Sequence, residues 1–138
     1  MIQQKEIRTI LKQRFSFILI DRVLKIEENE IVGIKNVTAS DINLWGHFDD
    51  EPIYPGALLI ETCSQLGGIL IAKKNPILKD GFLAQIDNFK FLKFIIPGDT
   101  IKINAVYAGK FSKFAKVDAT AFVDDDIVAK GSITYFFK

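Results

Sequence analysis

The chain has 138 residues, of which 49% are hydrophobic, and a formal net charge of +1. This length fits one domain over residues 1–138, and the near-neutral charge argues against a nucleic-acid partner bound by bulk electrostatics. The chain contains one cysteine and one histidine, so neither an intrachain disulfide nor a His-rich metal cluster is expected. The polar N-terminus does not resemble a signal peptide, and no apolar run reaches the roughly 18 residues of a membrane span. We therefore expect a cytoplasmic protein without membrane insertion.

The N-terminal third predicts a short helix and a hairpin. Over Gln3–Lys12, apolar residues recur at helical spacing between charged ones, which predicts an amphipathic helix. Phe15–Ile26, interrupted at Asp21-Arg22, is dense in β-branched and aromatic residues and predicts a strand. Ile31–Thr38 predicts the partner strand, and Ala39–Tyr54 is irregular.

A long buried helix is predicted from Pro55-Gly56 to about Lys74, because apolar residues occupy nearly every side of it. Proline suits the first position of a helix, where its missing N–H would have no partner anyway. Gly67 and Gly68 inside the helix each cost on the order of 1 kcal/mol relative to alanine. We expect that they allow the helix backbone to approach a sheet closely.

The C-terminal part predicts four further strands: Phe82–Phe94, Thr100–Gly109, Ala115–Val123 and Ile127–Phe136. One long helix wrapped by an antiparallel sheet is an α+β architecture.

The residues around the start of the long helix form a candidate acid/base site. Glu61 lies on a helix that is otherwise apolar, so its carboxylate needs a partner, and Gln65 lies four residues later on the same face. Gly56 offers a free N–H at the helix start, and His47 lies just upstream. Taken singly, the histidine could be an ordinary loop residue and the glutamate half of a structural ion pair. Cys63 is expected to be a buried apolar residue rather than a nucleophile.

The combination resembles a family signature. Gly46-His47-Phe48, then Pro55-Gly56, then Glu61 and Gln65, are similar to the motif of the FabZ-type (3R)-hydroxyacyl-acyl-carrier-protein dehydratases. The similarity covers nearly the whole chain, because it extends to Leu11–Val23, Ile34–Thr38, Ile86–Phe91 and Ile96–Asp99. The chain departs from the family pattern at three places: Asp49-Asp50 stand where Pro-Gly is usual, Tyr54 where Met is common, and Ser16 where Pro is common.

The resemblance implies a hotdog fold, in which an antiparallel sheet wraps around one long central helix. It also implies a dimer, possibly a trimer of dimers, with the site at the interface and His47 of one chain facing the glutamate of the other. The implied substrate is a 3-hydroxyacyl chain on the phosphopantetheine arm of an acyl carrier protein. His47 would be the base, Glu61 the acid and the Gly56 N–H the donor to the carbonyl oxygen, with Gln65, Phe48 and Pro55 lining the substrate. The implied reaction uses no metal or other cofactor.

Two other functions remain open at this point. The first is an acyl-thioester hydrolase, which uses the same fold class. The second is a non-catalytic hotdog subunit that binds an acyl carrier. If the partner is an acidic carrier protein, docking would use four basic residues in segments that resemble those flanking the family's site: Lys12, Arg14, Lys90 and Lys93.

Overall fold

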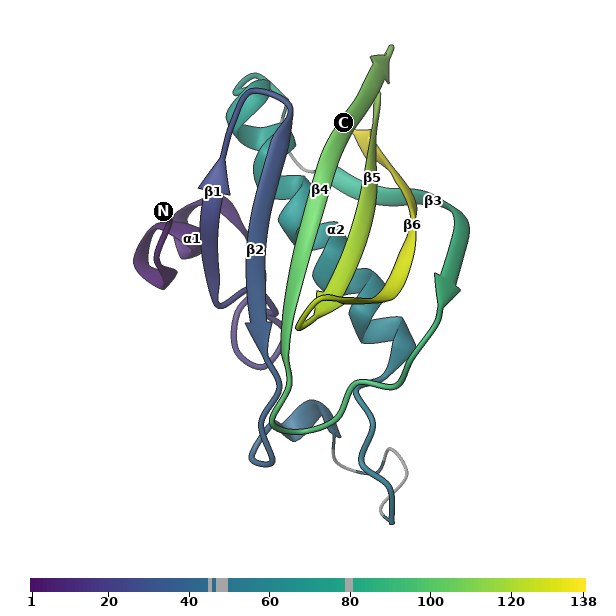
Figure 1. The fold of residues 1–138 in the computed structure, drawn as a ribbon. Coiled ribbons are helices and arrows are strands. Elements are labelled where there is room, and N and C mark those ends of the chain that lie inside the picture. The colour runs from purple at the N-terminus through teal and green to yellow at the C-terminus, as the bar shows by residue number, and fades with distance from the viewer. Residues whose placement is uncertain (45, 47–49, 79–80) are drawn as a thin grey trace.

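The computed structural model describes residues 1–44, 46, 50–78 and 81–138. Its elements in chain order are α1 (Gln4–Ile10), β1 (Arg22–Ile26), β2 (Glu30–Asn36), the 3-10 turn η1 (Ile42–Leu44), α2 (Gly56–Lys74), β3 (Gly81–Phe91), β4 (Thr100–Phe111), β5 (Phe114–Val123) and β6 (Asp126–Phe137). Figure 1 shows α2 running diagonally behind a curved sheet, with α1 beside β1 at one side. Within the described ranges, no helix has both the length and the apolar character that a membrane crossing requires.

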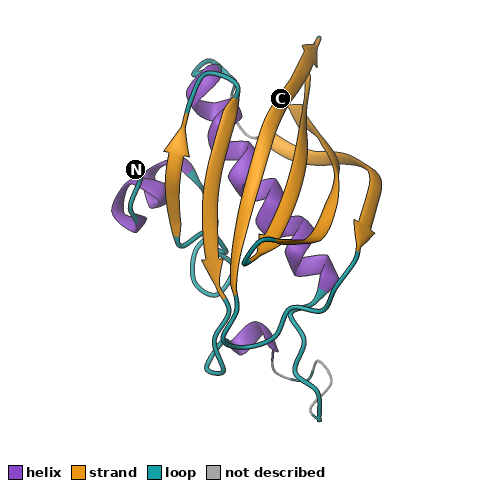
Figure 2. Ribbon diagram, in the orientation of Figure 1, coloured by secondary structure: helices purple, strands orange, loops and turns teal. Residues whose placement is uncertain are grey.

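The strands form one six-stranded sheet in the order β1-β2-β4-β5-β6-β3. Every neighbouring pair is antiparallel, and β4, β5 and β6 form a meander through two tight turns. Figure 2 shows the sheet wrapping around the long helix. The predicted α+β architecture is therefore confirmed.

The core lies between α2 and the concave face of the sheet. Residues 62–67 of α2 are all buried, which confirms the predicted burial on every side for the middle of the helix, whereas Ala57 and Lys73 near its ends are exposed. In β4 and β5, buried residues alternate with more exposed ones, as expected for strands with one face on the core. Most of the buried residues of β5 are alanines, whose small side chains leave room for the helix.

Gly67 and Gly68 differ in their surroundings. A Cβ atom on Gly67 would lie 2.8 Å from Val117 Cγ2 and would also collide with the Tyr135 hydroxyl. A Cβ atom on Gly68 would meet nothing within 4 Å. The expected close approach to the sheet is therefore confirmed for Gly67 and wrong for Gly68.

The predicted strand over Phe15–Ile26 is wrong in its first half, because only Arg22–Ile26 is a strand. The segment before it is a loop whose backbone bonds to a side chain of α2 instead of to a neighbouring strand: Leu19 N donates to Gln65 Oε1, and Phe17 O accepts from Gln65 Nε2. The high β-propensity of the segment is therefore overridden by tertiary hydrogen bonds.

Among the residues that the structure describes, β3 is an edge strand whose one partner is β6. None of its described residues is fully buried, and Phe82, Leu83, Ile86 and Phe91 are exposed large hydrophobic residues. A long apolar strand with one free edge is a template for pairing with another chain.

Candidate functional site

The start of α2 is set by the segment that leads into it. The helix begins at Gly56, so Pro55 is the N-cap residue and not the first helical residue that the sequence predicted. The N–H groups of the first turn have no partner within a helix, so they are available to an acceptor outside it. A Cβ atom on Gly56 would lie 3.1 Å from the ring of Phe91, so the glycine lets that ring lie close to the helix start.

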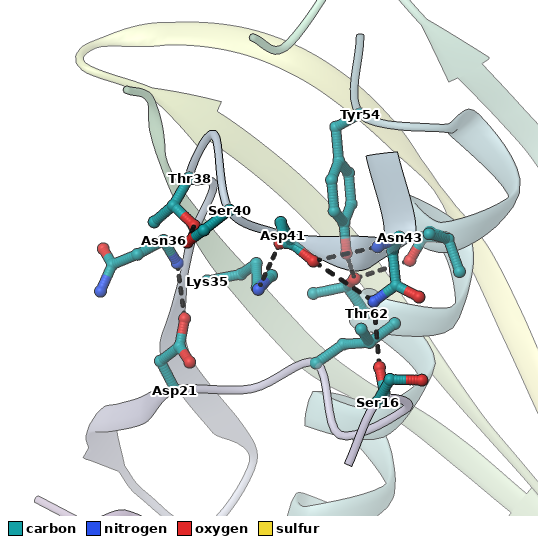
Figure 3. Close-up of polar contacts among 12 residues, drawn as sticks. Ser16, Asp21, Lys35, Asn36, Thr38, Ser40, Asp41, Asn43, Tyr54 and Thr62 are labelled. Carbon is teal, nitrogen blue, oxygen red and sulfur yellow. Dashed lines mark hydrogen bonds and ion pairs between the residues drawn. The ribbon is translucent and has the colours of Figure 1, made fainter. Parts of the chain in front are cut away.

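Tyr54 anchors this segment to the first turns of α2. Its backbone N–H donates to Ile95 O at 2.7 Å, and its hydroxyl lies 2.9 Å from Thr62 Oγ1. The Thr62 hydroxyl donates to Leu58 O at 2.6 Å, so the Tyr54 hydroxyl is the donor in the bond between the two side chains. Burial raises the pKa of Tyr54 above its usual range, which keeps the hydroxyl protonated and able to donate. Figure 3 shows the ring pointing down onto the helix.

Glu61 lies half-buried on α2, and Gln65 is its hydrogen-bond partner. Gln65 Nε2 lies 3.0 Å from Glu61 Oε1, which confirms that the amide holds the carboxylate. The orientation of the amide is fixed because the Leu19 N–H can only donate, so Gln65 Oε1 faces it at 2.9 Å. The amide nitrogen then donates one proton to Phe17 O at 2.8 Å and the other to Glu61.

This arrangement distinguishes the two oxygens of the Glu61 carboxyl group. Oε1 accepts a hydrogen bond from an amide that has no lone pair to offer in return. When the group is protonated, this bond favours the proton on Oε2, because a carbonyl oxygen is a better acceptor for the amide N–H than a hydroxyl oxygen. Among the described residues, the hydrogen bond from Gln65 occupies Oε1 and no side chain bonds to Oε2.

A second polar cluster precedes the histidine segment in the chain. Lys35 on β2 forms an ion pair with Asp41, with Nζ 3.0 Å from Oδ2 and the two side chains 11% and 9% exposed. Asn43, in the turn η1, donates from Nδ2 to Ser16 O at 3.0 Å. Figure 3 shows Asn43 between Asp41 and Ser16, with a dashed line to each.

The structure locates some of the residues predicted from the sequence. Gly56, Glu61 and Gln65 lie on the first three turns of α2, and Pro55 lies directly before it. His47 and Phe48 lie outside the described residues, as does Asp49. Cys63 is a buried free cysteine whose pKa is raised from 9.0 to about 12 by burial, as expected for a structural residue.

The sequence did not predict the polar contacts that surround these residues. Lys35, Asp41 and Asn43 carry no recognisable local pattern, and Phe17 and Leu19 contribute through their backbone. The one available signal was Tyr54, which differs from the residue common in the family. No three His, Cys, Asp or Glu side chains gather as metal ligands in the part of the chain that the structure describes.

Comparison with known proteins finds similarity over nearly the full length. A model of the FabA-like domain matches residues 11–132. A 3-hydroxyacyl-[acyl-carrier-protein] dehydratase FabZ of Streptococcus agalactiae serotype V is 39% identical over 136 residues, which are 98% of this chain and 97% of the relative. The FabZ of Rickettsia rickettsii (strain Sheila Smith) is 40% identical, covering 96% of this chain and 94% of its own.

Solved structures share the fold at lower identity. The dehydratase heterocomplex ApeI:P from Xenorhabdus doucetiae matches with a TM-score of 0.82 at 14% identity, covering 96% of this chain and 90% of that chain. A hypothetical thioesterase with coenzyme A from Streptococcus pneumoniae TIGR4 matches with a TM-score of 0.72 at 19% identity, covering 97% and 95%. These matches confirm the expected hotdog fold.

Proposed function

Since the chain belongs to the FabA-like family, and within it to the FabZ dehydratases, we propose that it converts a (3R)-hydroxyacyl thioester to the trans-2-enoyl thioester. The observation that carries this proposal is 39% identity to a FabZ over 98% of the chain. The geometry at α2 supports it, because Gln65 holds Glu61 with one oxygen free to act as an acid. The substrate would be carried on the phosphopantetheine arm of an acyl carrier protein, in fatty acid or related lipid biosynthesis.

In the proposed mechanism, each group has one task. His47 takes the proton from the carbon next to the thioester carbonyl, and the electron pair of that C–H bond becomes the new carbon–carbon double bond. Negative charge that builds on the carbonyl oxygen is stabilised by the Gly56 N–H. Glu61 delivers a proton from Oε2 to the departing hydroxyl, which leaves as water. The protons and electrons of this step balance without a metal or redox cofactor.

We also propose that the working unit is a dimer formed along β3. Its edge opposite β6 pairs with no other described strand of the chain, and its exposed apolar residues would be covered by the β3 of a second copy. His47 of one chain would then act with the glutamate of the other, as in the family pattern. A trimer of such dimers and a cytoplasmic location stay predictions.

An acidic carrier protein fits a cluster of positive charge near the end of β3. Lys90 stands directly opposite Lys130 of β6, a like-charged cross-strand pair that is unfavourable unless an anion lies nearby. Lys93 already pairs with Asp126, with Nζ 2.9 Å from Oδ2. Arg14 donates to Leu11 O and Gln13 O, so its guanidinium is held near the start of the loop that follows α1. We propose Lys90 and Lys130 as the main charges of this docking surface.

Hydration of crotonyl and longer 2-enoyl thioesters, followed by loss of their ultraviolet absorbance, tests the function directly. His47→Ala and Glu61→Gln should each lower turnover by about 10²–10⁴-fold, as loss of a general base or acid does. Release of free thiol without hydration would instead favour the thioester hydrolase, and neither reaction would favour a non-catalytic acyl-carrier-binding subunit.

Mixing the two inactive variants tests the shared site. If the site spans two chains, a heterodimer of His47→Ala and Glu61→Gln chains contains one intact pair, and activity returns. A stable, active monomer in sedimentation, or no recovery after subunit exchange, would contradict the shared site while leaving the dehydratase assignment intact.

A further inference from the structure

We propose that Asn43 is a positioning residue, which ties the turn before the histidine segment to the same stretch of backbone that holds Glu61. This inference rests on the proposed dehydratase function, and it adds a residue outside the expected catalytic set. Asn43 lies four positions before His47 in the chain.

The stretch Ser16–Leu19 bonds to Asn43 of η1 and to Gln65 of α2. Ser16 O accepts from Asn43 Nδ2 at 3.0 Å. Phe17 O and Leu19 N bond to the two ends of the Gln65 amide at 2.8 and 2.9 Å. Gln65 in turn donates to Glu61. Four consecutive residues of a loop therefore link η1 to the acid on α2.

The orientation of the Asn43 side chain follows from its neighbours. Ser16 O and Asp41 Oδ1, which lie 3.0 and 3.4 Å from Nδ2, can only accept hydrogen bonds, so the amide nitrogen must face both. Asp41 is itself fixed by its ion pair with Lys35 on β2. As Figure 3 shows, η1 is thus tied both to the sheet and to the loop.

These contacts favour a role in catalysis over a role in stability alone. Asn43 is only partly buried and makes one short side-chain hydrogen bond, so its removal leaves the core intact. The segment after η1 carries the proposed base, and a misplacement of about 1 Å at a reacting group can cost about 100-fold in rate. We therefore expect rate to suffer more than stability when the bond is lost.

In the proposed dimer, this link has a consequence for both sites. If His47 acts with Glu61 of the partner subunit, the hydrogen bonds Asn43–Ser16 and Gln65–Glu61 within one chain connect the base side of one site to the acid side of the other. Loss of Asn43 should therefore lower the rate at the site to which the altered chain supplies the histidine. The site to which that chain supplies Glu61 should be affected less, because Gln65 retains its own bonds to Phe17 and Leu19.

The test compares Asn43→Ala with Thr38→Ala in the full chain, using 2-enoyl-thioester hydration. Thr38 is a matched control because, among the described residues, its hydroxyl bonds to Ser40 alone, in the exposed start of the same segment. Asn43→Ala should lower kcat by about 10- to 100-fold with little change in KM, since an interaction used for orientation is lost. Amide hydrogen exchange at Ile42–Leu44 should become faster, and Asn43→Gln, which keeps the donor, should restore part of kcat.

A second experiment places Asn43→Ala on one chain of a mixed dimer. In the first mixed dimer, one chain carries Asn43→Ala with Glu61→Gln and its partner carries His47→Ala, so the Asn43→Ala chain supplies the histidine of the intact site. In the second, one chain carries Asn43→Ala with His47→Ala and its partner carries Glu61→Gln, so the Asn43→Ala chain supplies the acid. A larger loss in the first combination supports the proposal. An unchanged kcat in Asn43→Ala, a loss equal to that of Thr38→Ala, or equal losses in both combinations would overturn it. A wild-type protein without hydration activity would refute the proposed function instead, and unchanged exchange at Ile42–Leu44 would still refute the positioning role.

Discussion

Replacing Gln65 by leucine isolates the amide that holds Glu61. Leucine fills a similar volume, so no large cavity forms, but all three hydrogen bonds of a side chain that is 3% exposed are lost. The Leu19 N–H is left without its partner, and so is the Phe17 carbonyl, which lies nearer to solvent. An unpaired buried polar group costs about 1–3 kcal/mol, so we expect a loss of about 2–4 kcal/mol in the free energy of unfolding.

Two assays follow the two consequences of this change. For a chain of this length, each kcal/mol shifts the melting temperature by about 2–4 °C, so thermal unfolding should begin about 5–15 °C lower. Turnover in the hydration assay should fall by about 10- to 100-fold at a temperature where the variant is fully folded, because Glu61 loses the donor that orients it. KM should change little.

Gln3→Leu is the matched control, because Gln3 is exposed and its side chain bonds only to Met1 and Arg22 at the surface. The free energy of unfolding of the Gln3→Leu variant should change by no more than about 0.5 kcal/mol, and its turnover should be normal. If Gln65→Leu lowers the melting temperature but keeps full turnover, the amide has no part in orienting the acid. If Gln65→Leu changes neither the melting temperature nor turnover, the hydrogen bonds from Gln65 to Leu19, Phe17 and Glu61 are not formed in solution.

Three further predictions concern the core and the surface. Gly67→Ala should destabilise the protein by about 1–3 kcal/mol, because the added methyl collides with the Tyr135 hydroxyl. Gly68→Ala, with open space around it, should stabilise the helix by up to about 1 kcal/mol, so equal effects in chemical denaturation would contradict this difference. The raised pKa of the Cys63 thiol, from 9.0 to about 12, means that the folded state holds its proton where the unfolded state loses it. The free energy of unfolding should therefore fall as pH rises from about 9 to about 12, and a Cys63→Ala variant that falls equally would exclude the thiol as the cause. Lys90→Glu should raise KM for an acyl-carrier substrate with kcat nearly unchanged, and salt should weaken the wild-type interaction in the same way. Equal KM changes for a short pantetheine thioester would argue against docking at this position.

Much of the fold could be predicted from the sequence, because burial leaves a periodic pattern. The long apolar segment after Pro55-Gly56 predicted the central helix, and apolar-rich runs separated by turns predicted the four C-terminal strands. The prediction failed over Phe15–Asp21, where residues typical of strands form a loop. Local propensity cannot register that the backbone of this loop bonds to Gln65, which is 46 residues away from Leu19 in the chain.

In the candidate site, too, some contacts could be predicted from local spacing and others could not. Glu61 and Gln65 could be paired from the sequence alone, since positions four apart on a helix share a face, and that contact is confirmed. That the Gln65 amide donates to Glu61, instead of accepting from it, was decided by the Leu19 N–H, which orients the amide. The links from Asn43 to Ser16 and from Tyr54 to Thr62 join residues of different elements. Short-range spacing therefore determined the helix and the pairing of Glu61 with Gln65. Only the tertiary structure decided how that pair is held, because hydrogen bonds between distant segments leave no period in the sequence.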